Sequence, residues 1–499
     1  MATALRELVS LNPATLEPVG SVRATEPAEV AALVAAAADA QRAWREVQPA
    51  ERARVLREAG RVLRARADEI VALVSAETGK PPTEALTQDL YPAVDHAVWL
   101  ARSAPTLLRD ERIRFSQLHL RTKRAWTVRE PYGVVAAITP WNIPFGIPFV
   151  ETATALAAGN AVVLKPSDLT PLTAEQVPRV LAEAGLPAGL VQLAQGGAEV
   201  GEALVADGGV GKVFFTGSVA VGRAVAAAAG ARGCPVVLEL GGRDALVVFA
   251  DADLERAVEG AAFASFLNGG QACVSAERIL VERPVHDEFL ARLRERAASL
   301  RLGDEVGPLI SESRRDAVEE ASGALRGERA GWFLRPTVLE ERLPDRELFG
   351  PVVEVEPFDG EDEAVRLAND TAYGLGASVW TRDRSRARRV ARRLQVGMVW
   401  ANDFGYSFTT GQASWGGAKA SGFGRTSGRE SLYEFTWSKH VDWDSGRLRP
   451  PWWFPYDART EAALRALVDV LYGSRAERLR GAWRHRGALL HVVRRGLGR

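Results

Sequence analysis

Cysteine is scarce in this sequence: Cys234 and Cys273 are the only two among 499 residues. Two cysteines cannot form a disulfide framework, and these two do not cluster with histidines as a structural zinc site requires. We therefore expect no metal ion and a reducing, cytoplasmic compartment.

Long apolar runs are missing as well. No stretch reaches the length of a membrane-spanning helix, and Arg6 and Glu7 interrupt the place where a signal peptide needs an apolar core. Neither charge is in excess, because 63 basic residues balance 63 acidic ones, which gives no general attraction to nucleic acid. These absences favour an intracellular protein that acts on a small molecule.

What is present is an alternation of helical and strand patterns in a chain long enough for two or three lobes. Apolar spacing predicts a helix from an N-cap at Thr25 to Trp44, and a second helix after Pro49. Short apolar runs bounded by glycine or proline follow at 133–138, 161–164, 212–215, 236–238, 245–249 and 278–281. Runs of this kind between alanine-rich segments are typical of parallel sheets with crossover helices, and they predict two α/β lobes.

Cys273 closes a run that contains Gly269 and Gly270. A glycine-rich loop can expose a thiol, and neighbouring amide donors would lower its pKa, so Cys273 is a candidate nucleophile. A lone cysteine among apolar residues is more often a small buried packing residue.

Two further residues are candidates for chemistry. Glu239 ends an apolar run and lies 34 residues before Cys273. Burial would raise the pKa of such a carboxyl and suit it to take a proton from water, whereas an ordinary strand-end glutamate would face solvent. Asn142 lies between Pro140 and Pro144 in a constrained turn, where its amide could donate to an oxyanion or simply stabilise the turn.

Two runs resemble nucleotide contacts. Lys165 and Asp168 follow a predicted strand, and nucleotides bind at the carboxyl ends of strands in doubly wound sheets. The run 216–222 has the order strand, glycine turn and helix, which leaves backbone N–H groups free for a phosphate. Both runs also occur in ordinary loops.

Taken together and in this order, these runs closely resemble the aldehyde dehydrogenase superfamily from Asn12 to about Lys439. Further matching runs are 347–352, 369–375 and 415–422. The resemblance implies an α/β, aldehyde dehydrogenase-like fold with a Rossmann-like cofactor domain, an α/β catalytic domain and a small β oligomerisation element. The expected domains are 1–108 with 132–241 for NAD(P), 242–424 for catalysis, 109–131 with 425–448 for oligomerisation, and 449–499 as a basic amphipathic extension.

The resemblance also implies the chemistry. Cys273 would attack the aldehyde, and Asn142 would share the oxyanion with the backbone N–H of Cys273. Hydride would pass to the nicotinamide, and Glu239 would activate the water that releases the acid from the thioester. The family further implies a homodimer or homotetramer.

The cofactor contacts are likewise carried over from the resemblance. They are Thr139, Pro140, Trp141, Lys165, Ser167, Asp168, Gly217, Ser218, Leu240, Glu347 and Phe349. Asp168 stands where NAD-preferring members carry glutamate, and its shorter side chain leaves more room for a 2′-phosphate. We therefore expect NAD as the preferred cofactor, with NADP as the alternative.

The run from Cys273 to Ile279 is similar to that of a subgroup containing carotenoid-dialdehyde dehydrogenases, which predicts a long or bulky apolar aldehyde. The aromatic residues of the loop 402–408 fit an apolar substrate entrance, and they fit interface packing equally well.

The sequence beyond Asp442 becomes rich in tryptophan and proline and then in arginine, with apolar residues at helical spacing from Leu464 to Leu471. A basic amphipathic segment with tryptophans fits peripheral binding to an anionic membrane. A helix packed on the oligomer with a solvated basic face is the alternative.

Two other functions compete with aldehyde oxidation to the acid. A CoA-acylating or phosphorylating aldehyde dehydrogenase would not need Glu239 to activate water. A catalytically silent structural or membrane-surface scaffold would not need to keep Cys273, Glu239 and Asn142 together.

Overall fold

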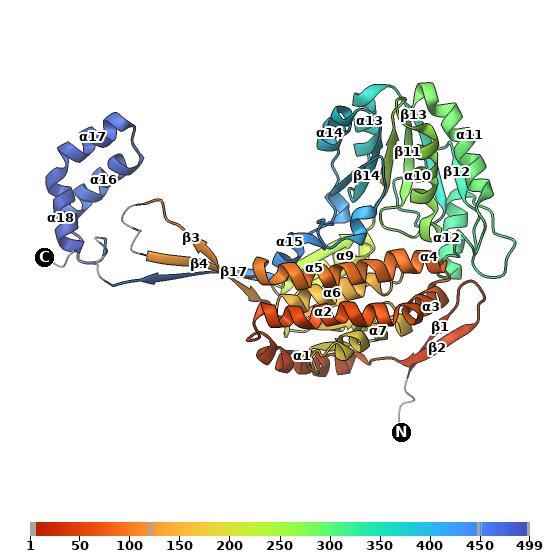
Figure 1. Ribbon diagram of the computed structural model, residues 1–499, viewed down its shortest axis with the longest axis horizontal. Helices are drawn as coiled ribbons and strands as arrows, with labels where there is room; N and C mark the ends of the chain where they lie inside the picture. Colours follow the sequence, from red (N-terminus) through yellow and green to blue (C-terminus); the bar gives the residue numbers. More distant parts are fainter. Residues whose placement is uncertain (1–5, 118–119, 121–122, 447–449, 451, 497–499) are drawn as a thin grey trace. The chain divides into compact units, whose positions relative to one another are not determined.

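The computed structural model describes residues 6–117, 120, 123–446, 450 and 452–496. Its internal contacts divide the chain into two units, one made of residues 1–108 and 130–437 and the other of residues 109–129 and 438–499. The larger unit contains two six-stranded sheets with helices packed against them (Figure 1).

The first sheet of the larger unit has the strand order β16-β9-β8-β5-β6-β7. Its strands are β5 Val134–Ile138, β6 Ala161–Lys165, β7 Val191–Leu193, β8 Val210–Gly217, β9 Val236–Leu240 and β16 Gly422–Phe423. All pairs are parallel except β16 with β9. Every residue of β5 and β6 is buried, as expected for strands covered on both faces.

Helices from the N-terminal third and from the crossovers cover this sheet (Figure 1). They are α1 Val30–Trp44, α2 Pro49–Ala65, α3 Ala67–Thr78, α4 Pro82–Glu84, the π-turn η2 Ala85–Leu90, α5 Tyr91–Leu107, α6 Gly146–Ala157, α7 Pro171–Glu183, α8 Ala198–Ala206, α9 Val219–Ala231 and α15 Gly428–Glu434. A hairpin of β1 Glu7–Leu11 and β2 Pro18–Arg23 precedes them.

The N-cap predicted at Thr25 is wrong. The helical segment begins with a short 3₁₀ turn, η1 Pro27–Glu29, whose N-cap is Glu26 in a capping box with Glu29. The Thr25 hydroxyl instead accepts the N–H of Gln195 at 3.0 Å, because this distant backbone donor lies beside it in the folded chain.

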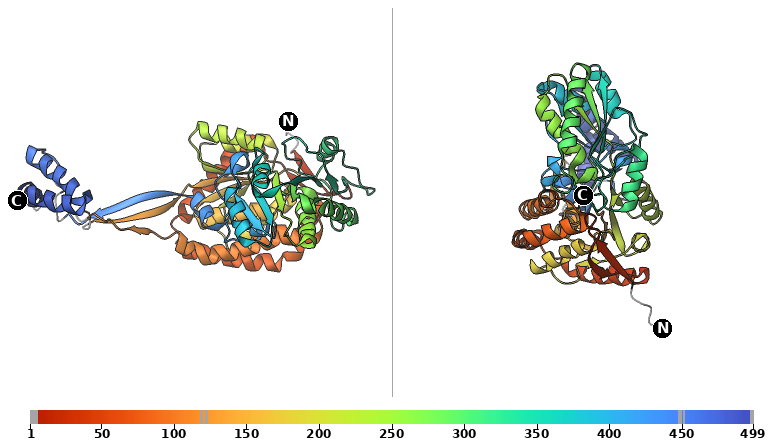
Figure 2. Two further views of the ribbon diagram at one scale, coloured as in Figure 1. Left: turned by 90° about the horizontal axis from the view of Figure 1, so that it is seen from above. Right: turned by 90° about the vertical axis from the view of Figure 1, so that its right-hand side faces the viewer.

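The second sheet of the larger unit has the order β12-β13-β11-β10-β14-β15 and is parallel throughout. Its strands are β10 Asp244–Val248, β11 Ala276–Glu282, β12 Thr337–Leu339, β13 Val352–Phe358, β14 Gly376–Trp380 and β15 Met398–Ala401. Its helical segments are α10 Leu254–Phe266, η4 Leu267–Gly270, α11 Arg283–Ser299, α12 Glu312–Ser322, α13 Gly360–Asn369, α14 Arg384–Arg393, η5 Tyr406–Thr409 and η6 Lys419–Ser421. Figure 2 shows both sheets and their helices from two further directions.

All six apolar runs predicted as strands lie in these two sheets, so the expectation of two parallel α/β lobes is confirmed. The smaller unit contains β3 Glu111–Ile113, β4 Lys123–Pro131 and β17 Thr436–Asp444 in the order β17-β4-β3. It also holds three helices, α16 Ala458–Tyr472, α17 Arg475–Arg484 and α18 Arg486–Gly496. The expected four-part domain division and the roles assigned to its parts stay predictions.

Candidate active site

The carboxyl ends of four strands of the first sheet bring most of the predicted site residues to one edge. Ile138 of β5 pairs with Lys165 of β6 and with Phe215 of β8, and Gly217 of β8 pairs with Leu240 of β9. The segments 139–142, 165–168, 217–218 and 239–240 therefore all leave the sheet at this edge, where parallel sheets bind ligands.

The loop that carries Cys273 follows α10 and adopts an uncommon backbone conformation. Asn268, Gly269 and Gly270 have φ values of 54°, 63° and 73°. A side chain at Gly270 would collide with the carbonyl oxygen of Gly350, and one at Gly242 would meet the carbonyl oxygen of Cys273 at 2.5 Å. The glycines thus allow three backbone segments to meet around the cysteine.

Asn142 is buried and hydrogen-bonded to the cysteine loop. Its Nδ2 donates to the carbonyl oxygen of Gln271 at 3.0 Å, which leaves the second hydrogen of the amide available to an oxyanion. The backbone carbonyl oxygen of Asn142 accepts from Asn268 Nδ2 at 3.1 Å and from Lys80 Nζ at 2.6 Å. Asn142 and Cys273 are therefore positioned by the same hydrogen-bond network.

Lys80 and Asp89 form a buried ion pair behind Asn142, with Nζ and Oδ2 separated by 3.1 Å. The other oxygen of Asp89 accepts the N–H groups of Phe145 and Gly146, at the start of α6. The sequence interpretation missed this pair, because neither residue lies in a motif that it used.

The electrostatic surroundings of Cys273 differ from the prediction. Burial raises the pKa of its thiol well above the ordinary value, and the nearby carboxyl groups of Asp244, Glu347 and Glu239 raise it further. The residue's own backbone N–H opposes this shift, but it is the weaker influence. The expected lowering of the pKa is therefore wrong, because Sγ is desolvated and its charged neighbours are acids.

Glu239 lies on β9, opposite Thr216 of β8 and Gly422 of β16. Its side chain is buried, and neither carboxyl oxygen has a hydrogen-bond partner within the described part of the chain. Burial raises the pKa of Glu239 well above its usual range, against the influence of Arg425 and with that of Glu151. This agrees with the predicted direction, and its bare oxygens are suited to accept a proton from water.

Glu151 is a second buried acid on the same side of the sheet, and the sequence interpretation missed it. Its Oε1 accepts the hydroxyl of Thr216 at 2.8 Å, and its Oε2 has no hydrogen-bond partner among the described residues. Burial raises the pKa of Glu151 well above its usual range. The signal that could have revealed it is its position as the one charged residue of α6.

Glu347 and Phe349 come from the loop before β13. The carboxyl of Glu347 accepts the N–H of Gly242 at 3.2 Å, and burial raises the pKa of Glu347 to about 8. The ring of Phe349 meets Trp141 edge-to-face, with 5.5 Å between the ring centroids. Trp141 from the first sheet and Phe349 from the second lobe thus face each other.

The buried acid Glu277 fixes this loop. Its Oε1 accepts the N–H groups of Leu348 and Phe349 at 2.8 and 3.0 Å, and it holds Phe349 at a φ of 56°, which is uncommon for a non-glycine residue. Arg243 is buried and forms an ion pair with Glu354 beside Glu277. Arg243 and Glu277 therefore position the predicted cofactor residues indirectly.

The first sheet edge fits a dinucleotide. Lys165 is only 8% exposed, and its ammonium forms no hydrogen bond or ion pair with the described residues, so it remains available to a polar ligand. The helix α9 begins after Ser218, and a side chain at Gly222 would meet Leu240 at 2.5 Å, which lets the helix start lie close to the sheet. Ribose hydroxyls at Lys165 and phosphates at the start of α9 match this chemistry.

The other predicted contacts at this edge are less constrained. Asp168 and Ser218 are exposed, while Thr139 is buried and donates its N–H to the carbonyl oxygen of Lys165 at 3.0 Å. Ser167 is not tied to the other site residues, because its hydroxyl accepts from the N–H of Leu169 in its own turn.

The aromatic residues of the loop 402–408 mostly pack inside the second lobe. The ring of Phe404 lies 5.8 Å from Trp400, and the ring of Phe408 lies 5.2 Å from Trp415, between centroids. Tyr406 is 58% exposed. Phe404 and Phe408 therefore pack within the lobe, which is neither the substrate entrance nor the interface packing that the sequence left open.

The sequence matches the model of the aldehyde dehydrogenase family over residues 1–441. It is 39% identical over 463 residues to a betaine aldehyde dehydrogenase of Cereibacter sphaeroides, an alignment that covers 88% of this chain and 94% of the relative. It is 38% identical to betaine aldehyde dehydrogenase 2 of Rhizobium meliloti, covering 87% of this chain and 94% of that protein.

Solved structures agree with these matches. Betaine aldehyde dehydrogenase of Staphylococcus aureus in complex with NAD+ has a TM-score of 0.85 and 32% identity, covering 90% of this chain and 94% of that one. The NAD+ complex of an aldehyde dehydrogenase from Bacillus cereus has a TM-score of 0.84 and 32% identity, covering 88% and 94% of the two chains. The predicted aldehyde dehydrogenase fold is confirmed.

These relatives carry a different name from the carotenoid-dialdehyde subgroup, so they lend no support to that finer assignment. They do support the predicted cofactor, since two of the matched structures hold NAD+. This chain belongs to the aldehyde dehydrogenase family, and it is an oxidoreductase that uses a nicotinamide dinucleotide, NAD or NADP, to oxidise aldehydes.

Proposed function

We propose that this enzyme oxidises its aldehyde to the free carboxylic acid through a thioester on Cys273. One arrangement carries the proposal: Asn142 is hydrogen-bonded to the cysteine loop at 3.0 Å, and the unpaired carboxyl of Glu239 lies near the carboxyl end of β9 in the same sheet that Asn142 follows. A nucleophile, an oxyanion donor and a base for water are the groups that this reaction requires.

In the first half of the reaction, Cys273 Sγ bonds to the carbonyl carbon of the aldehyde. The oxygen gains the electron pair of the carbonyl bond, and the free hydrogen of Asn142 Nδ2 together with the Cys273 N–H would stabilise that charge. Because burial disfavours the thiolate, the thiol has to lose its proton to solvent as the substrate and cofactor bind. NAD or NADP, when bound, supplies the acceptor for the hydride that leaves as the thioester forms.

In the second half, Glu239 takes a proton from water, and the resulting hydroxide adds to the thioester carbon. The carbon–sulfur bond then breaks, the carboxylic acid leaves, and Glu239 returns the proton it took from water to the sulfur. The desolvated carboxyl of Glu239 is a stronger base than an exposed one, which suits this step near neutral pH.

For the substrate we favour a small aldehyde and place betaine aldehyde first, because the relatives from Cereibacter sphaeroides and Rhizobium meliloti carry that name. The apolar or long-chain aldehyde predicted from the sequence lacks this support, and Phe404 and Phe408 are occupied in packing. Initial rates with betaine aldehyde and with decanal, each with NAD and NADP, test this choice. A higher kcat/KM for decanal would contradict it.

The mechanism is tested by replacing its two central residues. Cys273→Ala should abolish formation of the reduced cofactor, while Cys234→Ala, at the buried second cysteine, should leave it unchanged. Glu239→Gln should still release one equivalent of reduced cofactor in a burst, with later turnovers slowed by roughly 10²–10⁴-fold because water is no longer activated.

The CoA-acylating alternative makes the opposite prediction. If it were correct, wild-type turnover would need added CoA, and Glu239→Gln would release its product as fast as the wild type. Free acid formed without CoA, measured by chromatography of the product, would exclude it.

A further inference from the structure

We propose that the helices α17 and α18 form a docking face for an anionic membrane surface. The face consists of Leu479, Trp483, Leu490 and Val493 together with the arginines that surround them in residues 475–496. It lies wholly within the smaller unit and is separate from the residues proposed for aldehyde oxidation.

The apolar side chains of this face are unusually exposed. Leu479 and Trp483, one helical turn apart on α17, are 75% and 73% exposed, and Leu490 and Val493 on α18 are each 57% exposed. Each helix thus exposes a pair of large apolar side chains three or four residues apart, which marks a surface that another phase or partner covers.

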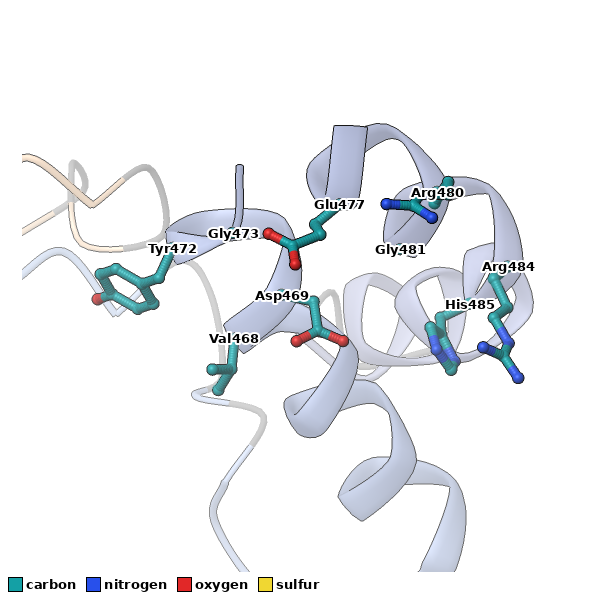
Figure 3. A pocket seen from close by; sticks show the side chains of 9 residues that line it. All are labelled: Val468, Asp469, Tyr472, Gly473, Glu477, Arg480, Gly481, Arg484 and His485. Carbon is teal, nitrogen blue, oxygen red and sulfur yellow. The ribbon is translucent and has the colours of Figure 1, made fainter. Parts of the chain in front are cut away.

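The three-helix bundle does not use these side chains for its own packing. Gly481 is the buried residue of α17, and a side chain there would meet Asp469 and Val470 of α16 at 3.4 and 3.6 Å. Because Leu479 and Trp483 each lie two positions from Gly481, helical geometry turns them away from α16. Figure 3 shows the hollow between α16 and α17, which is lined by polar residues such as Glu477 and Arg480 and not by Leu479 or Trp483.

The charge around the face is strongly positive. Residues 475–496 contain seven arginines and one acid, Glu477, which is engaged in the capping box at the start of α17. The guanidinium groups of Arg475, Arg484 and Arg494 form no hydrogen bond or ion pair with any residue that the structure describes. An anionic surface is the complementary partner.

Two features favour a lipid surface over other anionic partners. Arg486 stacks over the ring of Trp483 at 5.1 Å, and an arginine beside an exposed tryptophan suits the headgroup level of a bilayer. Nucleic acid would satisfy the arginines but would leave the four apolar side chains in water. A symmetric contact with a second copy would bring the two positive faces together.

The mode of binding follows from the length of the helices. Within the described residues, no helix has both the length and the apolar character needed to cross a bilayer. The face would therefore lie in the plane of the interface, with Leu479 and Trp483 inserted and the arginines among the lipid headgroups.

The test is flotation of the full-length enzyme with vesicles of phosphatidylcholine alone or mixed with phosphatidylglycerol. We expect flotation with the mixed vesicles at low salt, and loss of binding at high salt and with pure phosphatidylcholine. Trp483→Ser and Leu479→Ser should each reduce binding. Arg475→Gln with Arg494→Gln should weaken it by roughly fivefold per arginine.

Matched controls lie on the larger unit. Leu325→Ser changes a leucine that is 68% exposed, and Arg54→Gln with Arg57→Gln changes two exposed arginines of α2. These variants should bind vesicles like the wild type. Unchanged aldehyde oxidation in every variant would show that the proteins are folded.

Three results would overturn the proposal. The first is a wild-type enzyme that does not float with phosphatidylglycerol vesicles. The second is a Trp483→Ser variant with unchanged flotation but a smaller assembly mass, which would make the face a contact between subunits. The third is a pair of results with a short DNA duplex: the duplex abolishes flotation, and Trp483→Ser leaves binding to the duplex unchanged. Together they would make the arginines a nucleic-acid site.

Discussion

Cys273 combines a nucleophilic role with surroundings that disfavour its charged form. The side chain is desolvated, and the charges nearest to it belong to Asp244, Glu347 and Glu239. A thiol held neutral in this way is protected from oxidation and from stray electrophiles, because the thiolate is the reactive species. Its activation then depends on loss of the proton when the substrate and cofactor bind.

The raised pKa of Cys273 makes a direct prediction about its reactivity. In a Cys234→Ala background, which leaves one thiol, alkylation by iodoacetamide should be slower at neutral pH than that of a free cysteine. Because the thiolate fraction grows until pH exceeds the pKa, the rate should keep rising beyond pH of about 8.5, where free cysteine is half ionised. Mass spectrometry over a pH series measures the rate of alkylation, and a rate that reaches a plateau below pH of about 8.5 would contradict the prediction.

The Lys80–Asp89 pair makes a second prediction at this scale. Lys80→Met leaves a buried carboxylate without its counter-charge and should lower the free energy of unfolding by about 3–5 kcal/mol. It should also lower kcat, because Lys80 Nζ holds the carbonyl of Asn142 at 2.6 Å. Arg61→Met, which breaks the exposed pair with Glu58, should change stability by less than about 1 kcal/mol. Urea denaturation of both variants measures these losses in the free energy of unfolding. Equal losses would contradict the role of Lys80 and Asp89 as a buried ion pair that stabilises the fold.

At the scale of single elements, the cysteine loop shows what the sequence could and could not predict. The glycines at 269 and 270 correctly indicate a loop after α10. The contacts of Asn268 could not be predicted, because its Nδ2 donates to Asn142, 126 residues away in the chain. The direction of the Cys273 pKa was missed for the same reason, since the acids that surround it come from other strands and loops.

Gly270 should be the least replaceable residue of this loop. Gly270→Ala adds a side chain both at a φ of 73° and against the carbonyl oxygen of Gly350. Gly405→Ala is the matched control, because Gly405 has a φ of 66° but no atom within 4 Å of the added carbon. The control should cost about 1–2 kcal/mol for the backbone conformation alone. Gly270→Ala should destabilise the fold by more than this and should also lower kcat. Thermal unfolding measures the first effect, and steady-state rates measure the second.

At the scale of the whole molecule, the sequence predicted the strands well and their partners poorly. The apolar runs at 133–138 and 161–164 predicted buried strands, and every residue of the observed strands β5 and β6 is buried, as expected when both faces of a sheet are covered by helices. Nothing local indicates that β16 at Gly422 returns to pair with Glu239, or that Asn142 reaches the loop of Cys273. Buried acids such as Glu151 and Glu277 were overlooked because their environment is formed by distant segments.

The assembly of subunits remains a prediction that the smaller unit makes specific. The strand β17 lies at the edge of the three-stranded sheet, and Val441 and Trp443 on one of its faces are 39% and 54% exposed. An exposed edge strand with apolar side chains is a natural site for pairing with another chain. We therefore expect β17 to contribute to a homodimer or homotetramer.

Val441→Lys tests this expectation, because a lysine on an edge strand opposes pairing with a second chain. The variant should show a smaller mass by light scattering than the wild type at the same concentration. Val441→Thr, which keeps the branched shape without a charge, should keep the wild-type mass. If Val441→Lys kept that mass across a dilution series, β17 would not be the assembly surface. If Trp483→Ser alone lowered it, subunit contact would move to α17, and the membrane proposal would fail with it.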